Sequence, residues 1–130
     1  MAPIEVAITP DGTTVYVTNA VSHTVSAIDT GTNLVTSIPV GAGPSGVWSG
    51  NTPFGMRAFL TNSESDTSSV IDADPNSPTF NKVVDTIIKK VGDSPSDAAF
   101  TANGRKGYVP NNNDNTVSVI DTSTKWIGIL

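Results

Sequence analysis

Tyr16-Val17-Thr18-Asn19 decides the fold, because related tetrapeptides occur twice more, as Phe59-Leu60-Thr61-Asn62 and Tyr108-Val109-Pro110-Asn111. From each Asn the next ten residues align without a gap. The alignment places a Thr five positions and an Asp ten positions after each Asn: Thr24, Thr67 and Thr116, then Asp29, Asp72 and Asp121. This shared register predicts three copies of one structural unit.

The three units begin at prolines, Pro3, Pro44 and Pro95, so the predicted boundaries within the single segment 1–130 are 3–43, 44–94 and 95–130. Four short strands fit the first unit: Ile4 to Thr9, Thr14 to Thr18, Thr24 to Asp29 and Leu34 to Val40. Each is bounded by Gly, Asn, Asp or Pro, and Pro-Asp-Gly at 10–12 supplies a turn signal. Four antiparallel strands repeated about every forty residues are typical of a β-propeller blade. The predicted fold is all-β, a partial propeller of three four-stranded antiparallel blades.

Two copies depart from the pattern. In the second, Asn51-Thr52-Pro53-Phe54-Gly55 replaces the Asp-Gly turn, and Ser68-Ser69 stands where Val-Ser is expected. In the third, Pro110 removes a backbone donor, which predicts a departure from an ordinary central strand. The last strand of the third blade is expected to be truncated at Leu130.

The aromatic-Val-Thr-Asn core, the Pro-Asp-Gly turn, the strand Thr24 to Asp29 and the ending Ile38-Pro39-Val40-Gly41 resemble the YVTN β-propeller repeat family over nearly the whole chain. The resemblance implies the propeller fold. It also implies an extracellular, cell-surface or periplasmic location, since members are similar to archaeal surface-layer domains and exported bacterial proteins. Related propellers occur in lactonases and in cofactor-dependent dehydrogenase subunits, so the resemblance alone does not choose a function.

Composition excludes some classes of function. The chain carries a net charge of −5 with only seven Lys and Arg, which argues against nucleic-acid binding. No stretch is long enough and apolar enough to span a bilayer. The absence of Cys rules out disulfides, thiolate nucleophiles and Cys-ligated metals.

The residues that recur once per unit are predicted to be structural, because a catalytic group is usually needed at one place only. These residues are Asn19, Asn62, Asn111, Asp29, Asp72 and Asp121. Both residue types favour turns and bond to nearby backbone. No catalytic residue is predicted, since neither a Gly-x-Ser-x-Gly motif nor a histidine with evident partners is present.

The first strand of each blade lines the central channel of a propeller. Glu5, Gly46 and Asp97 are equivalent there, each two residues after the opening proline. Glu5 and Asp97, with Trp48 nearby, are therefore the predicted site for a polar or cationic ligand. For Trp48 the competing interpretation is core packing between blades.

A calcium loop is a minor alternative for Asp72, Asp74 and Asn76, which place oxygen ligands at alternate positions. However, Ser77 replaces the expected Gly at position six, and Val83 replaces the expected Glu at position twelve. A polar loop between outer strands is the favoured interpretation of this segment. No other cofactor is predicted.

The leading functional hypothesis is a non-catalytic propeller module with structural, protein-binding or ligand-binding roles. The alternative is a fragment of a propeller enzyme, lactonase-like or a cofactor-dependent dehydrogenase subunit. Three blades leave two apolar faces open, because propellers close with about four to eight. The expected partner is a second copy that closes a six-bladed ring as a homodimer, or further blades of a longer chain.

Overall fold

The computed structural model describes residues 2–87 and 94–122, and the backbone of 127–129. It confirms the all-β prediction with three antiparallel sheets of four strands, each in chain order. The first sheet contains β1 (Pro3–Ile8), β2 (Thr14–Asn19), β3 (Thr24–Asp29) and β4 (Val35–Pro39). The second contains β5 (Pro44–Thr52), β6 (Gly55–Asn62), β7 (Thr67–Asp72) and β8 (Val83–Ile87). The third contains β9 (Ala99–Phe100), β10 (Lys106–Asn111), β11 (Thr116–Asp121) and β12 (Ile127–Ile129).

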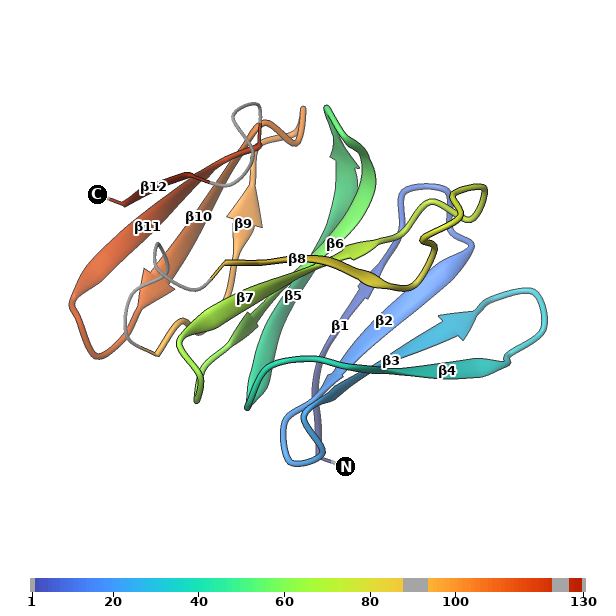
Figure 1. Cartoon of the computed structure of the whole chain (residues 1–130), viewed down its shortest axis with the longest axis horizontal. Helices are drawn as coiled ribbons and strands as arrows, with labels where there is room; N and C mark the ends of the chain where they lie inside the picture. The colour runs from blue at the N-terminus through green and yellow to red at the C-terminus, as the bar shows by residue number, and fades with distance from the viewer. Residues whose placement is uncertain (1, 88–93, 123–126, 130) are drawn as a thin grey trace.

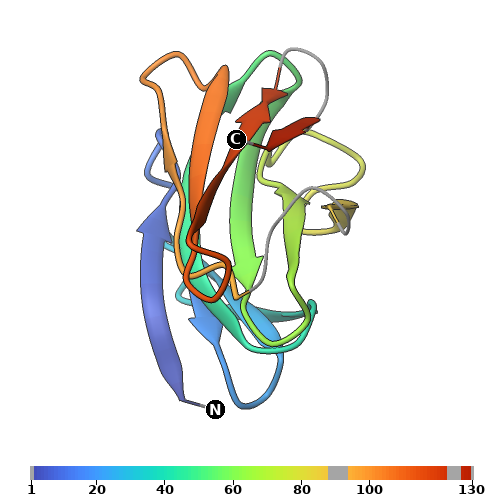
Figure 2. The ribbon, with the colours of Figure 1, turned by 90° about the vertical axis from the view of Figure 1, so that its left-hand side faces the viewer.

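The three sheets stand side by side, with the second between the other two (Figure 1). Figure 2 shows the first strands of the sheets on one side of the molecule and the later strands on the other. We call the side of β1, β5 and the residues leading into β9 the inner edge, and the side of β4 and β8 the rim. Among the described residues, no helix is long and apolar enough to cross a membrane.

The recurring Asn residues close the hairpin between the second and third strands of each sheet. Their side chains are buried, and each Nδ2 donates to the hydroxyls of a Thr and a Ser across the hairpin. The residue before that Thr has a positive φ in all three sheets: His23 (57°), Asp66 (57°) and Asn115 (55°). The repeated sequence therefore encodes a repeated four-residue turn.

The first and third sheets also share their first turn. Thr9 donates from its hydroxyl to Asp11 (2.7 Å), and Thr101 donates in the same way to Asn103 (2.8 Å). The second sheet instead has a two-residue turn at Pro53-Phe54 between longer strands. The end of this longer hairpin lies against Gly104 of the third sheet's first turn.

Two apolar clusters hold the sheets together. Between the first and second sheets lie Tyr16, Val25, Ala27, Ile38, Val47, Ala58, Leu60, Ile71 and Ala73. Between the second and third lie Phe59, Val70, Ile87, Val109 and Ile120, with Trp48, Ala98 and Phe100 packed against them. The second sheet is thus covered on both faces, and every residue of β7 is buried.

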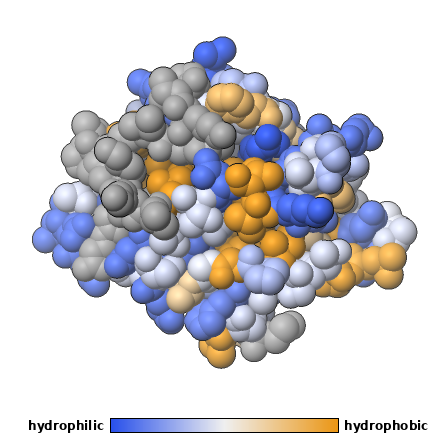
Figure 3. Space-filling model, in the orientation of Figure 1, coloured by the Kyte–Doolittle hydropathy of each residue, from blue (hydrophilic) through white to orange (hydrophobic). Residues whose placement is uncertain are grey.

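The outer faces of the first and third sheets are apolar and open. The pairing register places six β-branched residues on one face of the first sheet: Val6, Ile8, Val15, Val17, Ile28 and Val35. Of these, Val6 is 62% exposed and Ile8 is 56% exposed. On the third sheet, Tyr108 and Val117 are each 42% exposed. Leu34, in the β3–β4 turn, is 71% exposed. Figure 3 shows further apolar surface at its right-hand side.

The departure expected at Pro110 is found on one side of β10 only. β10 pairs with β11 along its whole length, and Pro110 lies opposite Val117. The Pro110 carbonyl accepts from the Ser96 amide (3.2 Å), so the backbone position that lacks N–H faces the β9 side. On that side β9 pairs with β10 only at Gly107 and Tyr108, and an isolated bridge joins Pro95 to Asn111, so the ladder is interrupted beside Pro110.

Candidate functional site

The inner edge is shaped by bulges at the start of β1 and β5. The pairing register shifts between Pro3 and Val6 in the first sheet, and between Pro44 and Val47 in the second. A threonine hydroxyl accepts the amide freed by each bulge: Glu5 N–H donates to Thr18 (3.2 Å) and Gly46 N–H to Thr61 (3.0 Å). Bulges re-aim side chains and are frequent beside active sites.

Hydroxyl groups also join neighbouring sheets along this edge. Thr18 donates to the carbonyl of Ser45 (3.0 Å), which links the first sheet to the second. The Ser45 hydroxyl donates to the carbonyl of Ser96 (3.2 Å), which links the second sheet to the third. The inner edge is therefore a polar, hydrogen-bonded seam that crosses all three sheets.

Glu5 and Asp97 lie on this seam in the first and third sheets, and both are exposed. Gly46 of the second sheet lies against Asp97: a Cβ on Gly46 would be 2.5 Å from Asp97 Cα and 2.8 Å from Asp97 Oδ1. A side chain at position 46 would displace Asp97. Glycine at the equivalent position thus makes room for the carboxylate of the next sheet.

Trp48 lies between the second and third sheets. Its ring stacks on Phe100 with centroids 4.1 Å apart and an interplanar angle of 21°. Phe59 meets Phe100 edge-on, with centroids 5.1 Å apart. The geometry matches the packing interpretation of Trp48, which forms a support behind the seam.

The β7–β8 connection folds around the carboxylate of Asp72. One oxygen accepts from Arg57 (3.0 Å) and from the Asp74 amide (3.0 Å), and the other accepts from the hydroxyls of Ser77 and Thr79. Burial raises the pKa of Asp72, but the hydrogen bonds from Ser77 and Thr79, the Asp74 amide and the Arg57 charge together hold this pKa below its usual value.

Of the residues considered for calcium, Asp72 ends β7, and Asp74 and Asn76 lie in this connection. The Asp74 carboxylate accepts from the Asn76 amide (2.9 Å), so this carboxylate and that of Asp72 both serve the loop's own hydrogen bonds. Within the described residues, no cluster of three or more His, Cys, Asp or Glu could hold a metal ion.

No protein-family model and no curated protein matches the chain. Solved structures do match its fold. Hydrazine synthase from Kuenenia stuttgartiensis aligns with 98% of the chain at 30% identity and a TM-score of 0.81. A putative 6-phosphogluconolactonase from Bacteroides fragilis aligns with 98% of the chain at 19% identity and a TM-score of 0.75. The periplasmic gluconolactonase of Pseudomonas aeruginosa aligns with 98% at 18% identity and a TM-score of 0.76.

The chain is a partial β-propeller. It spans 35% of the hydrazine synthase chain, 37% of the B. fragilis chain and 38% of the P. aeruginosa chain. Its three sheets are therefore three blades, each a repeat of four strands.

The prediction of a non-catalytic module is contradicted by these comparisons. Several of the matching structures are named as lactonases, which favours the lactonase-like alternative. The prediction was drawn from recurring residues, and recurrence says nothing of residues that differ from blade to blade. Glu5, Gly46 and Asp97 differ in this way and lie on the inner edge.

Sequence reasoning missed the hydroxyls of the seam. Thr18 and Thr61 occupy the third position of their signatures, where the third unit has Pro110. A hydroxyl shared by the two units with a bulge and absent from the third was the available signal. The role of this hydroxyl depends on the bulges, which the sequence alone does not predict.

Proposed function

We propose that the chain supplies three blades of a lactone-hydrolysing propeller whose reaction takes place at the inner edge. The observation that carries this proposal is the pair of exposed carboxylates, Glu5 and Asp97, on a hydrogen-bonded seam at either side of Gly46. The lactonase names of structures with the same fold support it. The substrate class is the lactone of a sugar acid.

Lactone hydrolysis suits a site of this kind. Water adds to the carbonyl carbon, the ring C–O bond breaks, and the ring oxygen leaves as a hydroxyl after taking up a proton. A carboxylate that accepts the proton of the attacking water is a general base, which contributes about 10²–10⁴ in rate. Glu5 or Asp97 takes this role in the proposal, and the groups that stabilise the developing oxyanion come from further blades.

The test is an assay of glucono-δ-lactone opening, followed by pH-stat titration and corrected for the spontaneous reaction. Glu5→Gln and Asp97→Asn are compared with Glu64→Gln, an exposed carboxylate in the β6–β7 turn. The base variant should lose about 10²-fold in kcat, while the control keeps full activity. A folded, assembled protein that opens the lactone no faster than buffer would refute the proposal.

We further propose that blades cover the two open apolar faces, either from a second copy or from a longer chain. The internal repeat supports this proposal, because the face that carries Tyr16 and Phe59 is covered by the following sheet in the first two blades. Tyr108, the equivalent residue of the third blade, is 42% exposed. Two chains of three blades would close a six-bladed ring, within the usual range of about four to eight.

An extracellular, cell-surface or periplasmic location is proposed on the same footing. It is supported by the resemblance of the repeat to YVTN-type propellers and by the similarity of the fold to the P. aeruginosa protein, which is named as a periplasmic gluconolactonase. Detection of the tagged full-length gene product in a periplasmic extract or in the medium, rather than the cytosol, tests this location.

A further inference from the structure

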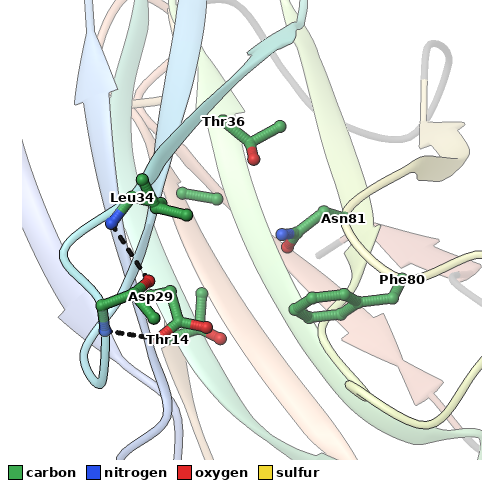
Figure 4. A pocket seen from close by; sticks show the side chains of 8 residues that line it. Thr14, Asp29, Leu34, Thr36, Phe80 and Asn81 are labelled. Carbon is green, nitrogen blue, oxygen red and sulfur yellow. Dashed lines mark hydrogen bonds between the residues drawn. The ribbon is translucent and has the colours of Figure 1, made fainter.

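A cavity lies at the rim, away from the inner edge. It has a volume of about 200 Å³ and lies between the first sheet and the β7–β8 connection. Figure 4 shows Thr14, Asp29, Leu34 and Thr36 of the first sheet and its β3–β4 turn on one side, and Phe80 and Asn81 on the other. We call this cavity the rim pocket.

One wall of the rim pocket offers hydrogen-bonding groups. Asp29 Oδ1 accepts from the amides of Gly31 (2.8 Å) and Thr32 (3.1 Å), while no described residue bonds to Asp29 Oδ2. The hydroxyls of Thr14 and Thr36 likewise make no hydrogen bond with any residue in the described part of the chain. These groups remain for a ligand.

The opposite wall combines an aromatic ring with an amide. Phe80 is half-buried and faces the cavity in Figure 4. The Tyr16 hydroxyl donates to Asn81 Oδ1 (2.7 Å), which fixes the amide so that its Nδ2 is a donor on the pocket side. The apolar ring of Phe80 opposite hydrogen-bonding groups suits a ligand that has one C–H face and several hydroxyls.

The volume limits the ligand to one ring. A cavity of about 150 Å³ takes benzene, and sites for drug-sized ligands have about 300–1,000 Å³. At about 200 Å³, the rim pocket fits a single six-membered ring with its substituents.

The charges around the pocket disfavour an anion. Asp29 lines the cavity, and none of the described residues that line it is a Lys or Arg. Burial first, and then the negative charges of Asp72 and Asp11, raise the pKa of Tyr16, whose hydroxyl holds Asn81. A phosphorylated or carboxylated sugar would bring another negative charge into the same field.

The Phe80 wall is held in place before any ligand binds. The Asn81 amide donates to the Asp72 carbonyl (2.8 Å), and the Phe80 amide donates to the Ser77 carbonyl (3.1 Å). Asn81 itself adopts a φ of 60°, which Asn tolerates better than most residues. Little ordering is therefore required on binding, which favours affinity.

The geometry points to a binding site for one neutral sugar unit in the rim pocket, with its C–H face on Phe80 and its hydroxyls on Thr14, Thr36, Asp29 and Asn81. This inference goes beyond the proposed lactonase activity and does not depend on it, because the two sites share no residue. A sugar unit reaches the pocket either as a free monosaccharide or as the end of a longer chain.

The test is saturation-transfer-difference NMR on the full chain with D-glucose, D-galactose and maltotriose as probes. At least one of these sugars should saturate with millimolar affinity, and glucose 6-phosphate should bind at least about tenfold more weakly. Either outcome supports the inference. Binding of a monosaccharide identifies a free sugar as the ligand, and binding of maltotriose without the monosaccharides identifies the end of a longer chain.

Two variants with matched controls locate the binding. Phe80→Ala and Thr36→Val should weaken it about tenfold and about threefold, respectively. Phe54→Ala and Thr86→Val, an exposed aromatic and an exposed threonine outside the pocket, should leave it unchanged. If Phe80→Ala unfolds the chain, Thr36→Val is sufficient as the test. Thr36 is exposed, so replacing its hydroxyl with a methyl group should leave the fold intact.

Three results would overturn the inference: no saturation up to about 50 mM sugar, equal binding of glucose 6-phosphate, or binding that survives both pocket variants. The lactone assay has a separate readout. A chain that binds sugar but opens no lactone would refute the proposed function and leave the sugar-binding inference standing.

Discussion

Ser68 and Ser69 are adjacent serines on β7 with opposite hydrogen bonding, and they provide a sharp test of the core. Ser68 has no exposed surface, and no described residue makes a hydrogen bond with its Oγ. It stands where the first and third blades have Val25 and Val117. Ser69 is 2% exposed, and its Oγ accepts from Asn62 Nδ2 (3.0 Å).

The expected effect of Ser68→Ala is an increase in stability. A buried hydroxyl without a partner costs about 1–3 kcal/mol, and the alanine variant removes this cost. Alanine has a low strand propensity, which offsets part of this stabilisation, since strand propensities span about 1 kcal/mol. The net free energy of unfolding should rise by about 1 kcal/mol, which corresponds to about 3–5 °C in Tm for a chain of this size.

Ser69→Ala is the matched control, with the same change at the next residue. It deletes a hydrogen bond and leaves the buried Asn62 amide with only Thr67 as its partner, so stability should fall by about 1 kcal/mol. Thermal unfolding followed by circular dichroism, with urea titration as a second measure, separates the two variants. If Ser68→Ala is destabilised as much as Ser69→Ala, the reasoning from the unpaired hydroxyl is wrong.

Four other expectations can be checked with similar means. A Cβ at Gly104 would overlap the Asn51 carbonyl oxygen, whereas one at Gly12 meets nothing within 4 Å. Urea titration should therefore show a loss of about 3 kcal/mol or more for Gly104→Ala and about 1 kcal/mol for Gly12→Ala, and equal losses would contradict the packing of the long hairpin. Because the pKa of Asp72 is lowered in the folded protein, its ionised carboxylate stabilises the fold at pH values above the unfolded pKa of about 3.9. This stabilisation is lost as the pH falls through the lower, folded-state pKa. Asp72→Asn should lack this loss of stability at low pH. An acid-unfolding profile identical to that of the unmodified protein would contradict the expectation. Light scattering at micromolar concentration should give a mass above the 13.4 kDa of one chain, and a stable monomer would contradict covering of the open faces by a second copy. Calcium or EDTA should leave Tm unchanged, because protein donors occupy both oxygens of Asp72; a clear rise with calcium would show the opposite.

The sequence was sufficient for the strands of the first blade. All four predicted ranges agree with β1 to β4 to within one residue at each end. The agreement has a local cause: Pro10-Asp11-Gly12 closes a turn in which Asp11 accepts from Thr9 and Thr13, and Gly12 adopts a φ of 73°. Turn residues act over a few positions, so their effect is readable along the chain.

Contacts between blades could not be predicted from the sequence. The Tyr16 hydroxyl meets Asn81 65 residues away, and nothing near either residue marks the other as its partner. The rim pocket depends on this contact and was therefore not predicted. The side of β10 that Pro110 affects could not be predicted for the same reason, since it depends on how far β9 extends beside this proline.

Comparison of the three blades separates structural from functional residues more finely than recurrence alone. Asn19, Asn62 and Asn111 make the same pair of hydrogen bonds in each blade, so each has a structural role within its own hairpin. Asp29 and Asp72 begin as equivalents, but only Asp72 organises a ten-residue connection, and that connection places Phe80 and Asn81 against the first blade. A position that recurs in sequence has thus acquired a different task in one copy. In a repeat protein, the place to look for binding is therefore where equivalent residues have different partners.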